Sequence, residues 1–301
     1  MYSQIASNRR KTWILIVFFV SFILGLGWIF SVATEAGSAP IILAIIIATI
    51  MSLTGYYAGD KIALTTHGAK KIEEKDNPYV YRMVENLAIT GGLPTPKVFL
   101  INDPHPNAFA TGRNPKNASV ALTTGIVERL TNEELEGVIA HELSHIKNYD
   151  IRVMTLVVVL VGIVALATDF FLRMHWYGFG NRRSRGGDGR LSAILLIIGL
   201  VLALISPIIA ELIKLAVSRR REFLADASGV LLTRYPEGLA NALRKISAYP
   251  NDLMRANHAT AHLFLVSPFK GTGKFLNKLF MTHPPIEERI AALENMGKNP
   301  V

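Results

Sequence analysis

Four long apolar runs stand out from the mixed polarity of the chain, at approximately residues 13–32, 40–57, 153–172 and 191–217. A helix of about 20 apolar residues crosses a hydrocarbon core of about 30 Å, so each run is long enough to span a membrane. Trp and Tyr stand near the ends of the runs, where membrane interfaces favour them. The first run is too long for a secretory signal and no cleavage site clearly follows it, so we interpret it as a retained anchor. The pattern predicts a mainly α membrane protein with about four transmembrane helices.

The polar stretch between the second and third runs contains an amphipathic helix with a clear start. Thr131 and Glu134 have the spacing of a capping box, in which each side chain bonds the backbone of the other residue. Apolar residues then follow at helical spacing on one side: Leu135, Ile139, Leu143 and Ile146. His141 and His145 lie off this stripe, which suits side chains that point into a cleft.

The same helix carries the sequence His141-Glu142-Leu143-Ser144-His145. Residues i and i+4 share a helix face about 6 Å apart along the axis, so both imidazoles can reach one ion. Two neutral nitrogen ligands with a nearby carboxylate base suit a zinc site that activates water. The motif predicts such a site, although two surface histidines beside a solvated glutamate remain an alternative on the motif alone.

A third protein ligand is needed for a catalytic zinc, and a candidate lies after the fourth apolar run. Glu222 and Asp226 are an i, i+4 pair on one helix face, so Glu222 could bind the metal while Asp226 accepts the far ring N–H of a ligand histidine. Ordinary surface charges on a juxtamembrane helix remain the alternative. The two apolar runs between His145 and Glu222 cross the membrane twice or not at all, so both residues lie on one side in either case.

Two short strand patterns, Lys97–Ile101 and Ala118–Leu122, flank the segment Asn107–Gly112. They predict a small sheet that covers the helical core.

Composition and charge support a membrane protein. Apolar residues make up 50% of the 301 residues and charged residues 18%, and the mean hydropathy is +0.31. The net charge of +9 is explained by Lys and Arg beside membrane segments and anionic lipid headgroups. No nucleic-acid recognition module is present, so we expect no nucleic-acid partner. The chain contains no cysteine, which excludes disulfides and cysteine-type zinc sites.

Charge also predicts orientation. Arg9, Arg10 and Lys11 precede the first run, which places the N-terminus in the cytoplasm. The second run then returns the chain to the cytoplasm, so the histidine motif faces that side. The basic loop between the third and fourth runs fits less well, so these runs either form a transmembrane hairpin, the interpretation we favour, or pack against the catalytic domain without fully crossing.

The order of the motifs resembles the HtpX family of membrane-bound zinc metalloproteases, which are related to the CAAX prenyl proteases. Two N-terminal spans precede Asn107–Gly112 and the histidine motif; two further apolar runs precede Arg221–Asp226, and a late Thr282-His283-Pro284-Pro285 follows. The resemblance implies one Zn²⁺ per chain, bound by His141, His145 and Glu222.

The resemblance also implies roles for other residues. Glu142 becomes the catalytic base, and Asp226 stays the partner of a ligand histidine. The segment Asn107, Ala108, Phe109 and Ala110 becomes an edge strand that pairs with an extended substrate backbone. His283 would approach the metal, either to stabilise the oxyanion or to occupy the open metal position in a resting state. The alternative is a histidine that simply begins a terminal helix, 286–296, on which Arg289 is one of the exposed candidates.

These observations predict a zincin-like α+β protease domain, built from 58–152 and 218–301, that faces the cytoplasm. Residues 1–57 would form the anchor of two membrane helices, and 153–217 two further hydrophobic helices. The expected protein is a multi-pass zinc endopeptidase of the cell (inner) membrane that hydrolyses peptide bonds with a zinc-activated water. The resemblance implies quality control of misfolded membrane proteins and a role in the stress response.

Three other functions remain open. A CAAX-type prenyl-protein protease would have similar motifs but typically more membrane helices. A non-catalytic metal-binding membrane scaffold would hold zinc without turnover. A metal transporter would place ligands inside the spans, but the apolar runs contain no histidine.

Overall fold

The computed structural model describes residues 2–160, 162, 219–249, 253–254, 263–266 and 284–298. Most of the third apolar run, all of the fourth, and His283 lie outside these residues.

Two long helices begin the chain and pack against each other as a hairpin. Helix α1 spans Tyr2–Thr34 and helix α2 spans Ala39–Thr66, and the turn between them places Gly37 at φ 64°. Both are long and apolar enough to cross a membrane, over Ile5–Val32 and Ala39–Thr66. They expose large apolar side chains such as Trp13 and Ile50, as lipid-facing helices do. Helix α2 continues past residue 57 as one helix, so the chain leaves the apolar run without a break.

A mixed four-stranded sheet follows, in the order β1-β2-β4-β3. Strand β2 pairs parallel to β4, while β1 with β2 and β3 with β4 pair antiparallel. The strand predictions at 97–101 and 118–122 are confirmed, and β3 lies at an edge of the sheet. The bounds of the strands are Lys70–Ile72 for β1, Lys97–Ile101 for β2, Ala108–Asn114 for β3 and Asn117–Thr123 for β4.

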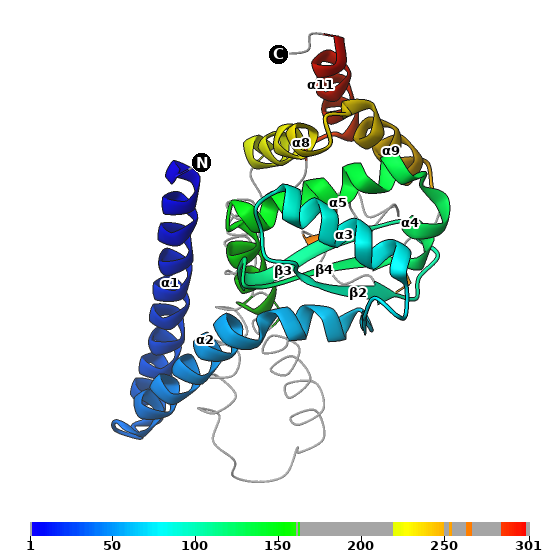
Figure 1. Cartoon of the computed structure of the whole chain (residues 1–301). Helices are drawn as coiled ribbons and strands as arrows, with labels where there is room; N and C mark the ends of the chain where they lie inside the picture. Colours follow the sequence, from blue (N-terminus) through cyan, green and yellow to red (C-terminus); the bar gives the residue numbers. More distant parts are fainter. Residues whose placement is uncertain are drawn as a thin grey trace.

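Helices cover both faces of the sheet (Figure 1). Helices α3 and α5 lie on one face, where Val98, Val120 and Leu122 join their apolar side chains in one core. The other face packs Phe109 and Ala121 against the C-terminal end of α2 and the helical residues 150–160. The helices of this region are α3 (Pro78–Thr90), α4 (Thr124–Arg129) and α5 (Asn132–Lys147).

Three C-terminal helices complete the domain: α8 (Arg219–Thr233), α9 (Pro236–Ala248) and α11 (Ile286–Lys298). Helix α5 lies between the sheet and the pair α8 and α9, and α11 packs on α9 and α8 (Figure 1). Glycine allows these close approaches. A Cβ on Gly229 of α8 would lie 3.1 Å from the backbone nitrogen of His141. The two chain parts separated by the third and fourth apolar runs are therefore packed directly on each other.

Candidate metal centre

Helix α5 starts as its sequence predicts. The Glu134 N–H donates to Thr131 Oγ1 at 3.4 Å, and the Thr131 N–H donates to Glu134 Oε2 at 2.8 Å, which completes the capping box. Lys245 Nζ of α9 also donates to Glu134 Oε2, at 2.7 Å. This cap and the apolar stripe together set the rotation of α5, so that its two histidines point to the same place.

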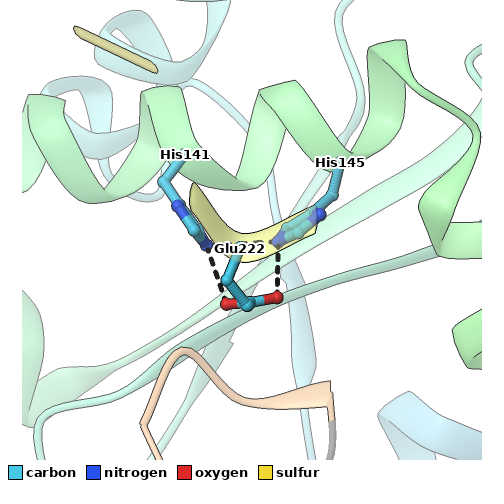
Figure 2. Close-up of side chains that lie close together, drawn as sticks. All are labelled: His141, His145 and Glu222. Carbon is cyan, nitrogen blue, oxygen red and sulfur yellow. Dashed lines mark hydrogen bonds and ion pairs between the residues drawn. The ribbon is translucent and has the colours of Figure 1, made fainter. Parts of the chain in front are cut away.

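Among the residues that the structure describes, three side chains have the spacing of a metal site: His141, His145 and Glu222. The two Nε2 atoms lie 3.1 Å apart. One Glu222 carboxylate oxygen lies 3.8 Å from His141 Nε2, and the other lies 3.6 Å from His145 Nε2. Figure 2 shows the Glu222 carboxylate facing both rings. All three side chains, two from α5 and one from α8, are buried.

Each histidine is held from behind by a carboxylate. His141 Nδ1 lies 2.8 Å from Asp226 Oδ1, and His145 Nδ1 lies 3.1 Å from Asp150 Oδ2. A carboxylate accepts the Nδ1–H, which leaves the Nε2 lone pair free to bind a metal. Two such lone pairs facing each other at 3.1 Å repel unless a positive charge lies between them. The donor set of two imidazoles and one carboxylate therefore fits a divalent metal ion, and it is a set that zinc accepts.

The charges around the two histidines also favour a bound cation. Burial alone would lower the pKa of His145, but the hydrogen bond to Asp150 and the charge of Glu222 raise it to about 9. The carboxylates thus favour a positive charge at this point, which a metal ion supplies as well as a proton does. Burial lowers the pKa of His141, which keeps that imidazole neutral.

Glu142 lies between the two histidines in sequence and is buried beside them. Its carboxylate accepts a hydrogen bond from the Ala110 N–H of strand β3. Burial raises the pKa of Glu142 to about 7. A carboxyl group with such a pKa can both take up and release a proton near neutral pH.

Two residues of the centre were missed from the sequence. Arg289 was expected among the exposed positions of its helix, and this was wrong, because it is completely buried. Its Nε and Nη2 donate to the two oxygens of Asp226 at 2.8 and 2.6 Å. Burial alone would raise the pKa of Asp226, but the charge of Arg289 and its hydrogen bonds hold it below the ordinary value. A signal did exist, because Arg289 shares a helix face with the buried Leu293.

Asp150 is the second missed residue, and nothing in its spacing pointed to it. It follows the C-terminal end of α5, after a turn in which Tyr149 takes φ 61°. That turn brings its carboxylate back to His145, a fold that helical periodicity does not predict.

The edge strand is partly occupied by the chain itself. The Leu265 N–H donates to the Ala108 carbonyl at 3.0 Å. The Asn107 side chain donates to the Val266 carbonyl at 2.9 Å. Ala108 and Ala110 face the α5 side of the sheet and Phe109 the other side, and all are buried. Leu265 and Val266 therefore occupy the positions at Ala108 and Asn107 where the predicted substrate strand would pair.

A mixed sheet, a helix with two histidines and a glutamate, and a second helix that brings a carboxylate define the class of protein as a metalloprotease. The model of Peptidase family M48 matches residues 74–297, which include all of these features. The fold itself is similar to the crystal structure of S. mikatae Ste24p, with a TM-score of 0.50 and 18% identity over 98% of this chain and 67% of that one.

Relatives with higher sequence identity assign the chain to one group of these metalloproteases. A Protease HtpX homolog from Caldanaerobacter subterraneus subsp. tengcongensis is 44% identical over 296 residues, 98% of each chain. Another, from Tropheryma whipplei, is 45% identical over 297 residues, 99% of each chain. The chain therefore belongs to peptidase family M48 and, within it, to the HtpX proteases. The prediction of a metalloprotease is confirmed.

Proposed function

We propose that this chain is a zinc-dependent endopeptidase that cleaves misfolded membrane proteins, with its active site facing the cytoplasm. The observation that carries the proposal is the convergence of two Nε2 atoms and a carboxylate in one buried place. With both Nδ1 atoms already held by carboxylates, the histidines have the tautomer and orientation that a zinc ligand needs.

His141, His145 and Glu222 would hold the metal and leave a position open. A zinc ion bound there would lower the pKa of a water molecule toward about 7 and polarise the scissile carbonyl. Glu142 takes the proton from the attacking water and later gives it to the leaving amine. Its buried position and its pKa of about 7 suit both transfers.

The edge of β3 suits an extended peptide backbone. In the structure the chain's own residues 263–266 take this place, with the Leu265 N–H on the Ala108 carbonyl. A substrate strand that replaced them would offer the same donor to Ala108 and would run beside Glu142. Recognition through backbone groups selects extended chain rather than sequence, which suits unfolded segments.

Orientation is inferred from charge. The basic residues Arg9, Arg10 and Lys11 stand at the N-terminal end of α1. Asn8 at that same end donates a hydrogen bond to Asp150 beside the histidines, which supports a site on the same side of the membrane as the N-terminus. Basic residues favour the cytoplasmic side.

The test uses the full chain in lipid nanodiscs, with metal analysis and cleavage of an unfolded protein such as casein. Purified protein should contain about one zinc per chain; a chelator should abolish cleavage, and added zinc should restore it. Full cleavage by the metal-free protein would contradict the proposal. Cleavage confined to a prenylated CAAX peptide would favour the prenyl-protease alternative instead.

A further inference from the structure

Asp150 is the meeting point of three chain segments. Its Oδ2 lies 3.1 Å from His145 Nδ1 on α5. Its Oδ1 accepts from the Asn8 side-chain amide of α1 at 2.7 Å and lies 3.2 Å from Arg221 Nε of α8. All four side chains are buried. A residue from the first apolar helix is thus two hydrogen bonds away from a candidate metal ligand.

The side-chain amide of Asn8 donates a second hydrogen bond, to the turn that precedes Asp150. Asn8 Nδ2 also donates to the Asn148 carbonyl, at 2.9 Å, where α5 ends. The next residue, Tyr149, has φ 61°, a left-handed conformation that is uncommon outside glycine and asparagine. Asn8 therefore links the two sides of the turn that directs Asp150 toward His145.

Packing holds α1 in this place. Leu15 and Phe19 of α1 lie in one apolar cluster with Val153, Leu156 and Val157, which directly follow Asp150. The guanidinium of Arg9 lies over the Tyr149 ring, 5.8 Å from its centroid. The bonds from Asn8 belong to this extended contact between α1 and the residues after α5.

We propose that Asn8 is a positioning residue of the metal centre. It orients the Asp150 carboxylate, which in turn fixes the ring and tautomer of His145. The N-terminal membrane helix is then part of the active site as well as an anchor. The inference rests on the proposed function, since it assumes that His145 binds the metal.

The test measures zinc affinity by competition with a chelator, in the full-length protein in nanodiscs, together with its melting temperature. Asn8→Leu keeps the branched shape and the number of heavy atoms of the side chain but removes both donations, and should weaken zinc binding about 10-fold to 100-fold. Thr12→Val is the matched control, because Thr12 is also buried on α1 but its hydroxyl donates to the Asn8 carbonyl of its own helix, at 2.9 Å. It should leave zinc affinity unchanged.

A double-mutant cycle separates positioning from general packing. If Asn8 acts through Asp150, Asn8→Leu should add little to the loss of zinc affinity caused by Asp150→Asn. Additive losses would overturn the inference, as would wild-type zinc affinity in Asn8→Leu. If Asn8→Leu does not fold, Asn8→Ala also removes both hydrogen bonds and should weaken zinc binding in the same way. Failure of wild-type protein and Thr12→Val to bind zinc would instead refute the proposed function itself.

Discussion

Arg289 is the residue on which the buried charges around His141 depend. It pairs with both oxygens of Asp226, and its Nη1 lies 3.5 Å from Glu222 Oε2. Removing one partner of a buried pair leaves an uncompensated charge, which costs about 3–5 kcal/mol. Arg289→Met should therefore lower the free energy of unfolding by about that amount, measured in denaturant, and should also weaken metal binding.

Arg244 of α9 provides the control, because its partner lies on α11, the helix that carries Arg289. It pairs with Glu294 of α11, but both side chains are more than 40% exposed. Surface pairs are worth less than about 1 kcal/mol, so Arg244→Met should change stability little. Equal losses for the two variants would contradict the role assigned to the buried pair.

The site residues that could be identified from the sequence are those related by helical spacing. His141, Glu142 and His145 follow from an i, i+4 motif on a capped helix, and Glu222 with Asp226 from a second i, i+4 pair. Asp150 and Arg289 could not be identified in this way. A turn after α5 brings Asp150 to His145, and a tertiary ion pair with Asp226 brings Arg289 to the site. A charged residue on an apolar helix face, such as Arg289, can only be assigned once its partner is known.

Helix α5 depends on close contact with α9. A Cβ on Gly137 would lie 2.8 Å from the Leu239 backbone nitrogen, so one of the two helices must move. Overpacking of this kind costs about 1–3 kcal/mol, and Gly137→Ala should lower the melting temperature accordingly. Gly25→Ala in α1 is the matched control, since a Cβ there meets nothing within 4 Å. A stabilising effect of Gly137→Ala would contradict the packing described.

The elements themselves were largely predictable. The cap of α5 and strands β2 and β4 came from local patterns, while the edge strand was implied by the family resemblance. The continuation of α2 to Thr66 was not predictable, because its last turns leave the apolar run and bury only Ala63 and Leu64 against the sheet. The occupation of the β3 edge by residues 263–266 was also not predictable, since it joins segments more than 150 residues apart.

In the whole molecule, the chain before the third apolar run packs against the chain after the fourth, and the proposed orientation places this domain in the cytoplasm. Orientation can be tested with single cysteines, because the chain has none of its own. Ala36→Cys lies between α1 and α2, and Lys75→Cys lies in the exposed loop after β1. A membrane-impermeant maleimide should label Ala36→Cys in intact cells but label Lys75→Cys only after permeabilisation. The reverse pattern would place the active site outside.

In the proposed function Glu142 transfers the protons while other residues hold the metal. The most direct measurement compares zinc content and casein cleavage for the wild type and Glu142→Gln. Glu142 is not one of the three side chains that converge on the metal position, so the variant should retain its zinc. Its cleavage rate should fall by about 10²-fold to 10⁴-fold, as for loss of a general base. Cleavage at the wild-type rate by a zinc-loaded Glu142→Gln protein would show that Glu142 is not the general base.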